Sequence, residues 1–339
     1  MEKHHLILND EFSFELGGSI PQLEITYCTS GQLNKAKNNV VWVFHALTAN
    51  ADCEDWWKGL IGKGQVFNPE EHYIVCANIL GSCYGTSGPT SINPTTNQPY
   101  LYDFPAITIR DMVKAHQLLA DHLNIEDIQF AIGGSMGGYQ LLEWNLLEPE
   151  RFKNAIIIAS SLKESAWGIA IHEAHRKAIE ADATWRNGHL NDGRFGLKAA
   201  RSFGMILYRS YESYLHSQEE EHNDIPNQFK AASYIAYQGE KFTNRFNAIS
   251  YHYLLSAMDT HNVSRGRSTD LTTTLNQIQT QYLIIGISSD YLCPTQEQKM
   301  MKNYLKNSTL NIIDSKYGHD GFLVEHEIIS SKIREQFNI

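Results

Sequence analysis

The stretch Phe130–Trp144, FAIGGSMGGYQLLEW, runs from an apolar segment into a serine that has glycines on both sides. An apolar run, a glycine-rich turn and a helical pattern in this order predict a strand, a sharp turn and a helix. The letters Gly133 to Gly137 fit G-x-S-x-G, in which a strained turn lifts the serine hydroxyl above the edge of a sheet. Tiny residues two positions before and after the serine leave room for that turn. A plain glycine-rich turn has the same letters, so Ser135 is a candidate nucleophile that the rest of the chain must support.

Apolar runs of strand length recur on both sides of this stretch. They are Val40–Phe44, Tyr73–Leu80, Ile128–Ile132, Ala155–Ser160, Gln281–Asp290 and Thr309–Asp314. Helical patterns lie between them, such as Thr108–Leu123 with its broad apolar stripe. Continuous apolar strands alternating with helices predict an α/β fold with a mostly parallel central sheet covered by helices on both faces.

This alternation of predicted strands and helices is absent between residues 161 and 280. The segment is rich in Ala, Glu, His, Tyr and Arg and contains helical runs such as WGIAIHEAHRKAIEA and NAISYHYLLSAMD. We therefore predict an α/β core formed by residues 1–160 and 281–339, with a helical lid inserted at 161–280.

The composition and charge of the chain argue against some classes of binding partner. The chain has 339 residues, with 28 basic against 38 acidic side chains and a net charge of -10, which opposes attraction to nucleic acid. The N-terminal residues lack the apolar core of a signal peptide, and no run approaches the length of a membrane span, so we expect no membrane partner and a cytoplasmic location. The five cysteines are scattered and never spaced as C-x-x-C, which favours free buried thiols over disulfides or zinc ligands.

An acid and a histidine follow Ser135 in the order that a serine triad on this kind of fold requires. Asp290 ends the predicted strand Gln281–Asp290, and His319 follows the last predicted strand. Because the carboxyl ends of parallel strands meet at one edge of a sheet, we expect both side chains near Ser135. In a triad His319 takes the proton of Ser135, and Asp290 holds the imidazole tautomer. The alternatives are an ordinary loop histidine and a turn carboxylate.

Two backbone N–H groups are candidates for an oxyanion hole. Met136 follows the serine at the start of the predicted helix, where N–H groups point at a developing negative charge. Leu47 lies in HALTAN, residues 45–50, directly after the strand Val40–Phe44, where hydrolase-like folds supply the second donor.

Other patterns are given no function. HEAH at 172–175 lacks the two-residue gap of the zinc motif H-E-x-x-H, so we interpret it as a solvated helix face. GLIGKGQ at 59–65 is not a phosphate loop because Gly64 follows Lys63. With no dinucleotide fingerprint, metal set or Schiff-base lysine in the sequence, we expect no metal and no resident cofactor.

Longer blocks along nearly the whole chain carry a resemblance. They are HALTAN at 45–50, GSCYGTSGPTSINPTTNQPY at 81–100, DFPAITIRDMVKAHQLL at 103–119, GGSMGGYQLLEW at 133–144, AIEADATW at 178–185, SFGMILYRS at 202–210, SSDYLCP at 288–294 and GHDGFLVE at 318–325. With them the chain resembles the homoserine O-acetyltransferase family of the α/β-hydrolase fold. The blocks at 81–100 and 103–119 are far more specific than the glycine-rich turn and separate this family from generic esterases.

The resemblance also implies substrate-binding residues. It implies that Arg209 binds the carboxylate of an amino acid acceptor and that Asp320 binds its ammonium group. A guanidinium matches a carboxylate in two parallel hydrogen bonds, so the chemistry agrees. The residue types alone fit a surface ion pair for Arg209 and a helix N-cap for Asp320 equally well.

The activity that the resemblance implies is acyl transfer from acetyl-CoA to the hydroxyl of L-homoserine through an ester on Ser135, by a ping-pong mechanism in methionine biosynthesis. It also implies a homodimer formed through the lid, with acetyl-CoA as a substrate and not as a cofactor. Departures from the family pattern at Tyr139, Ala183, Gly321 and 50–57 bear on pocket shape. Homoserine O-succinyltransferase, serine O-acetyltransferase, an ester or thioester hydrolase with the same triad, and a binder that retains the fold are therefore kept as alternatives.

Overall fold

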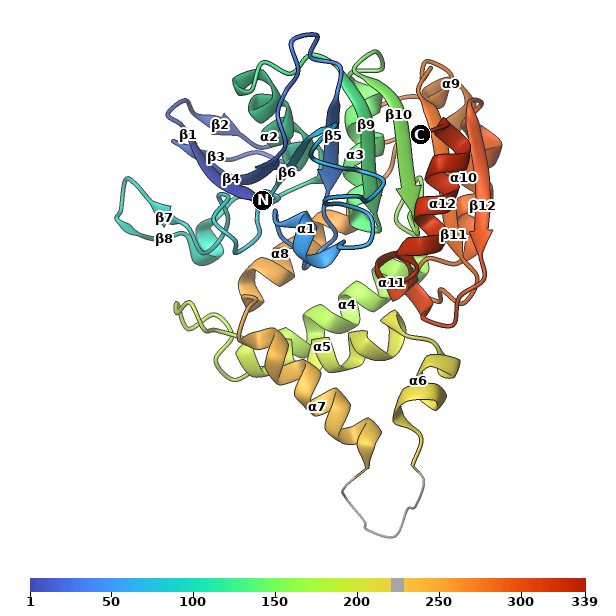
Figure 1. The fold of residues 1–339 in the computed structure, drawn as a ribbon. Coiled ribbons are helices and arrows are strands. Elements are labelled where there is room, and N and C mark those ends of the chain that lie inside the picture. The colour runs from blue at the N-terminus through green and yellow to red at the C-terminus, as the bar shows by residue number, and fades with distance from the viewer. Residues whose placement is uncertain (221–228) are drawn as a thin grey trace.

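The fold is centred on an eight-stranded sheet in the order β1-β4-β6-β5-β9-β10-β11-β12 (Figure 1). The computed structural model describes residues 1–220 and 229–339. The sheet strands are β1 (Glu2–Leu8), β4 (Leu23–Ser30), β5 (Val40–Phe44), β6 (Tyr73–Ala77), β9 (Ile128–Gly134), β10 (Phe152–Ile158), β11 (Gln281–Ile287) and β12 (Ser308–Ile313). Strand β4 runs antiparallel to both of its neighbours, and all pairs from β6 to β12 are parallel. The predicted mostly parallel sheet is confirmed.

All six strands expected from apolar runs are present, while β1 and β4 were not anticipated. Strand β1 is the edge strand and is largely exposed, whereas β4 lies between β1 and β6 and is largely buried although polar residues interrupt its apolar ones. The edge strand β1 needs no continuous apolar run because it faces water. The apolar run of β4 is interrupted by Thr26 and Thr29, whose buried hydroxyls are hydrogen-bonded to His5 and His4 of β1. Two short hairpins, β2 (Phe12–Ser13) with β3 (Ser19–Ile20) and β7 (Ile92–Asn93) with β8 (Gln98–Pro99), stand apart from the sheet.

The two faces of the sheet are buried in separate hydrophobic clusters. Along β5, Trp42 and Phe44 belong to one cluster and Val41 and Val43 to the other, and all four side chains are inaccessible to solvent. Successive side chains of a strand point to opposite faces, so only a continuous apolar run fills both layers. This is why the apolar runs of the sequence identify the central strands.

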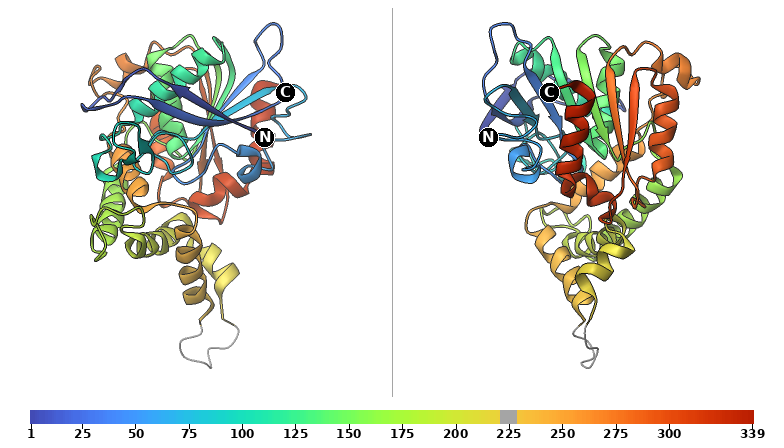
Figure 2. Two further views of the ribbon diagram at one scale, coloured as in Figure 1. Left: turned by 90° about the vertical axis from the view of Figure 1, so that its left-hand side faces the viewer. Right: turned by 45° about the vertical axis from the view of Figure 1, so that its right-hand side comes forward.

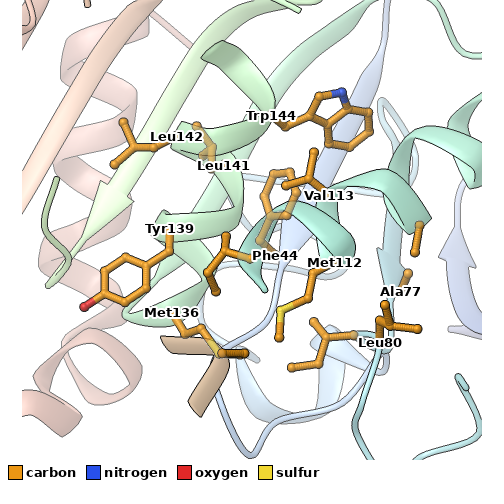
Figure 3. Packing of buried hydrophobic residues seen from close by; sticks show 14 of the residues in the cluster. Phe44, Ala77, Leu80, Met112, Val113, Met136, Tyr139, Leu141, Leu142 and Trp144 are labelled. Atoms are coloured by element: carbon orange, nitrogen blue, oxygen red, sulfur yellow. The ribbon is translucent and has the colours of Figure 1, made fainter. Parts of the chain in front are cut away.

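Helices α2 (Ile109–His122) and α3 (Met136–Leu147) cover the first face. In Figure 3 Trp144 of α3 and Val113 of α2 lie beside Phe44 of the sheet, and the rings of Trp144 and Phe44 meet edge to face at 5.9 Å. Helix α2 begins at a capping box in which Thr108 and Asp111 each accept the other's backbone N–H. These contacts fix the helix that follows Ser135 against the strand that precedes HALTAN.

The remaining helices either pack on one of the two faces of the sheet or form the segment between β10 and β11. Their bounds are α1 (Cys53–Trp56), α4 (Ala166–Glu180), α5 (Arg194–Tyr208), α6 (Tyr211–Gln218), α7 (Lys230–Thr243), α8 (Ala248–Asp259), α9 (Leu271–Leu275), α10 (Thr295–Tyr304), α11 (Gly321–Val324) and α12 (His326–Phe337), with 3-10 turns η1 (Leu101–Asp103) and η2 (Gly318–Asp320). Helix α12 packs on the second face through Ile329 and Ile333. Within the described ranges, no helix has the length and apolar content to cross a membrane.

Helices α4 to α8 project from the carboxyl-end edge of the sheet, as Figures 1 and 2 show. Residues 221–228 of the segment 161–280, which we interpret as a lid, lie outside the described residues. Leu254 of α8 and Leu197 of α5 belong to the same hydrophobic cluster as Trp42 of the sheet. The helical segment is therefore packed onto the sheet through a continuous apolar core.

Candidate active site

Ser135 lies at the turn between β9 and α3, as the sequence predicts. Its backbone has φ 55° and ψ -126°, a conformation that a residue with a side chain rarely adopts. The turn is held because the Ser135 N–H donates to the Ile158 carbonyl at 2.9 Å and the Ser135 carbonyl accepts from the Gly138 N–H at 2.9 Å. The serine side chain is thereby fixed at the carboxyl end of the central strand.

The glycines around Ser135 are required by close backbone contacts. A Cβ atom on Gly133 would lie 2.5 Å from the Gly137 carbonyl oxygen, and a Cβ atom on Gly137 would lie 2.2 Å from the carbonyl oxygen of Phe44. Real Cβ atoms do not approach a backbone this closely, so helix α3 meets β9 and β5 only because these positions lack side chains. This is the physical reason for the sequence GGSMG.

Asp290 and His319 come together although 29 residues separate them. The Nδ1 atom of His319 lies 2.7 Å from Oδ2 of Asp290, and both side chains are almost wholly buried. The other Asp290 oxygen, Oδ1, accepts the backbone N–H groups of Leu292 and Cys293 at 2.8 Å each. Because a carboxylate only accepts hydrogen bonds, Nδ1 of His319 carries the hydrogen, and Nε2 keeps the free lone pair of the neutral ring.

The protonation of His319 is set by opposing effects. Burial lowers the pKa of His319. The charge and hydrogen bond of Asp290, together with the charges of Asp320 and Glu164, raise the pKa by more than burial lowers it, so the pKa stands above the ordinary 6.5. Within the described residues no hydrogen bond joins His319 to the Ser135 hydroxyl, although both line one cavity. Such bonds are commonly long in ligand-free enzymes and shorten when substrate binds.

Both predicted oxyanion residues lie at this cavity. Leu47 lines it, and Met136 follows Ser135 as the first residue of α3. No hydrogen bond of the described residues uses the N–H of either residue, so both donors are available to a ligand. The N-terminus of α3 adds the positive end of a helix dipole at the same place.

The cavity has a volume of about 350 Å³, within the range of small-molecule sites. One wall comes from the core and the other from the helices between β10 and β11. The core residues are Ala46, Leu47, Thr48, Ala49, Asn50, Asp55, Trp56, Tyr84, Ser135, Leu292, His319, Asp320, Phe322 and Leu323, and those of the helical segment are Ile171, His172, His175, Arg201, Tyr208, Arg245 and Met258.

The two residues that the resemblance assigns to substrate binding contact each other. The Nε atom of Arg209 lies 2.9 Å from Oδ2 of Asp320, and Asp320 lines the cavity whereas Arg209 does not. Burial raises the pKa of Asp320, and the charges of Arg209 and Arg201 oppose that rise. Arg209 directly follows α5, and this end of the helix packs on Gly318, so the pair joins the helical segment to the loop that carries His319.

A second arginine, which sequence reasoning missed, does line the cavity. The guanidinium of Arg201 lies over the rings of Tyr208 at 5.3 Å and Phe242 at 4.8 Å. Its Nε atom is buried and donates to no partner in the described residues. Arg201 lies on the apolar stripe of α5, four residues after Leu197 and four before Met205, and this spacing is the signal that could have found it.

The interpretation of HEAH as a solvated helix face is wrong. His172 and His175 are 4% and 1% exposed, and both line the cavity. They share one face of α4 with the buried residues Ile171 and Ile179, at the three- and four-residue spacing of a helix. That spacing predicts burial, and comparison with a metal motif alone overlooked it.

Comparisons with known proteins agree with this geometry. A family model described as the alpha/beta hydrolase fold matches residues 39–326. A homoserine O-acetyltransferase of Cyclobacterium marinum is 44% identical over 318 residues, which cover 94% of this chain and 90% of that protein. The chain belongs to the homoserine O-acetyltransferase family.

Solved structures show the same fold inside and outside the homoserine O-acetyltransferase family. The homoserine O-acetyltransferase from Bacillus anthracis aligns with a TM-score of 0.90 at 23% identity and covers 100% of this chain and 98% of its own. The structure of esterase E22 aligns with a TM-score of 0.89 at 24% identity, covering 98% of this chain and 99% of its own. The fold therefore serves both acyl transfer and ester hydrolysis, and the side chains of the cavity have to distinguish them.

Proposed function

We propose that this protein transfers an acetyl group from acetyl-CoA to the hydroxyl of L-homoserine, through an acyl-enzyme on Ser135. The observation that carries the proposal is the 2.7 Å contact between His319 and Asp290 at a cavity that also holds Ser135 and Arg201, whose buried Nε has no partner among the described residues. The names of the relatives support the choice of acceptor and acyl group.

The proposed reaction has two half-reactions. In the first, His319 takes the proton of Ser135 as the serine oxygen bonds to the thioester carbon; the carbon–sulfur bond then breaks, and the proton leaves with the CoA thiol. The Leu47 and Met136 N–H groups stabilise the tetrahedral oxyanion. In the second, His319 takes the proton of the homoserine hydroxyl as its oxygen attacks the ester, and the proton returns to Ser135 when the product leaves.

The acceptor is proposed to bind as a zwitterion. Asp320 receives the ammonium group, and a guanidinium receives the carboxylate. Arg209 is the residue that the family resemblance suggests for the carboxylate, whereas Arg201 lines the cavity and its buried Nε has no partner among residues 1–220 and 229–339. Because Arg209 already lies against Asp320, we assign the carboxylate contact to Arg201 and propose that Arg209 orients Asp320.

Hydrolysis is the second candidate, because the fold of esterase E22 covers nearly the whole chain. Water competes with homoserine for the same acyl-enzyme. Arg201 lines the same cavity as Ser135 and forms no hydrogen bond or ion pair with the described residues, which favours an acceptor that carries a carboxylate over water. Succinyl-CoA as donor and serine as acceptor require no change to the triad and are tested in the same experiment.

The experiment is thiol release by the purified protein with acetyl-CoA or succinyl-CoA, and with homoserine, serine or no acceptor. Fast release only with acetyl-CoA and homoserine supports the proposal, and equal release without an amino acid supports hydrolysis. Ser135→Ala is the control for both. A fluorophosphonate probe that fails to label Ser135 would favour a binder that retains the fold.

We also propose that the protein is a homodimer formed through the helical segment, and that it acts in methionine biosynthesis. Large apolar side chains stand exposed on α5, α6 and the start of α7: Phe195, Phe203, Ile206, Tyr211, Leu215 and Phe229. Exposed apolar patches of this kind mark interaction surfaces. Sedimentation as a monomer at micromolar concentration would overturn the dimer.

A further inference from the structure

A second histidine of the cavity wall, His172, is also held by a carboxylate. The Nδ1 atom of His172 lies 2.7 Å from Oδ1 of Asp259, and Oδ2 of Asp259 lies 2.7 Å from a guanidinium nitrogen of Arg176. Asp259 belongs to α8, and both of its partners belong to α4. The pair is therefore held between two helices of the segment that covers the active site.

This arrangement defines what His172 offers to a ligand. A carboxylate beside a guanidinium is ionised and only accepts hydrogen bonds, so Nδ1 of His172 carries the hydrogen that Asp259 accepts. In the neutral ring Nε2 then has a free lone pair. No hydrogen bond of the described residues uses Nε2, and His172 lines the cavity. Its free group is thus an acceptor at the wall of the cavity.

The acceptor molecule supplies the matching donor. In the proposed function the amino acid has its hydroxyl at Ser135 and its carboxylate at Arg201, and His172 lines the same cavity as both residues. The ammonium group of the amino acid has three N–H donors. Asp320 has one oxygen against Arg209, so it leaves at least one of these donors without a protein partner.

We propose that His172 is a specificity-determining residue whose Nε2 accepts a hydrogen bond from the ammonium group of the amino acid acceptor. Asp259 is the positioning residue that fixes the tautomer. The assignment rests on the proposed function for the identity of the acceptor. According to this proposal, His172 makes the enzyme prefer an α-amino acid over the same molecule without the amino group.

The test removes the ammonium group and the histidine separately and together. L-Homoserine is compared with 4-hydroxybutyrate, which differs only in lacking the amino group, for the wild type and for His172→Phe. We expect kcat/KM for homoserine to fall at least tenfold in the variant, mostly through KM, while kcat/KM for 4-hydroxybutyrate changes less than twofold. Equal losses for both acceptors would overturn the assignment, because a structural role affects both.

Three further variants sharpen the result. His172→Gln keeps an acceptor oxygen, so it should recover part of the discrimination that His172→Phe loses. Asp259→Asn should lose discrimination with His172 intact, since it no longer fixes the tautomer. The matched control is His252→Phe: His252 is also held by a carboxylate, Glu180 at 2.9 Å, but lines a different cavity, so it should leave the ratio of the two acceptors unchanged.

Failure of the proposed function can be told apart from failure of this inference. If the wild type acylates no homoserine, the proposed function fails, and the inference is then tested by binding alone. In calorimetry L-2-aminobutyrate should bind the wild type more tightly than butyrate, and His172→Phe should remove that preference. Unaltered preference in a variant with wild-type circular dichroism and normal fluorophosphonate labelling of Ser135 overturns the role of His172.

Discussion

Asp290 holds His319 with one oxygen, at 2.7 Å from Nδ1, and receives two backbone N–H groups with the other. Asp290→Asn keeps the shape but presents an amide in place of an accepting oxygen, which favours the wrong imidazole tautomer. We expect kcat for thiol release to fall by roughly 10³- to 10⁴-fold, with the circular dichroism spectrum unchanged. A loss below tenfold would show that Asp290 does not orient His319.

The pH dependence of kcat/KM follows from the raised pKa of His319. Burial alone would lower that pKa, but the effect of the Asp290 carboxylate is larger. The pKa of His319 in the free enzyme is therefore above the ordinary 6.5. The protonated ring cannot act as a base. We therefore expect activity to decrease as the pH falls, with an inflection above 6.5, and we expect Asp290→Asn to move the residual activity's inflection downward. A wild-type inflection below 6.5 would contradict this electrostatic balance.

The central strands and the positions of the proposed triad residues could be predicted from the sequence because each depends on local chemistry. A strand buried on both faces must be apolar throughout, as Val40–Phe44 is, and a turn such as the one at Ser135 needs glycine neighbours. The same logic finds a polar side chain where a predicted strand ends, as with Asp290. None of these inferences needs the three-dimensional arrangement of distant segments.

The residues of the helical segment could not be assigned in this way, because their roles depend on which helix face meets the core. Arg201 and His172 are polar residues on apolar stripes, and only the packing of α4 and α5 against the sheet makes those stripes walls of a cavity. The contact between Arg209 and Asp320 joins residues more than a hundred positions apart. The family resemblance predicted a separate role for each of these two residues, but it did not predict that they contact each other.

Gly137→Ala tests the close packing behind the nucleophile. The new Cβ atom would lie 2.2 Å from the Phe44 carbonyl oxygen, so α3 must shift and carry the Met136 N–H with it. We expect a loss of about 1–3 kcal/mol in the free energy of unfolding and a fall in kcat of up to about 10²-fold. Gly64→Ala is the control for the close contact: its φ of +75° makes the substitution cost stability, but a Cβ atom there meets nothing within 4 Å, so kcat should stay unchanged.

Glu143 tests whether buried ion pairs stabilise the packing of the helical segment on the core. This residue of α3 has a side chain 3% exposed, which pairs with Arg110 of α2 at 2.6 Å and with Arg267, between α8 and α9, at 2.6 Å. Removing one partner of a buried ion pair leaves uncompensated charge. We expect Glu143→Gln to lower the free energy of unfolding by about 3–5 kcal/mol, measured by urea denaturation.

The pH dependence of that stability gives a second, independent measurement. Burial would raise the pKa of Glu143, but Arg267 and Arg110 lower it below the ordinary 4.5. A carboxylate with a lowered folded pKa stabilises the protein above its unfolded pKa and loses this effect as the pH falls through the folded value. The stability difference between wild type and Glu143→Gln should therefore be full at neutral pH and shrink in acid. Glu70→Gln is the control: it removes an exposed ion pair with Lys63 and should change neither the free energy of unfolding nor its pH dependence. Equal behaviour of the two variants would show that the buried ion pairs of Glu143 do not stabilise the packing of the helical segment on the core.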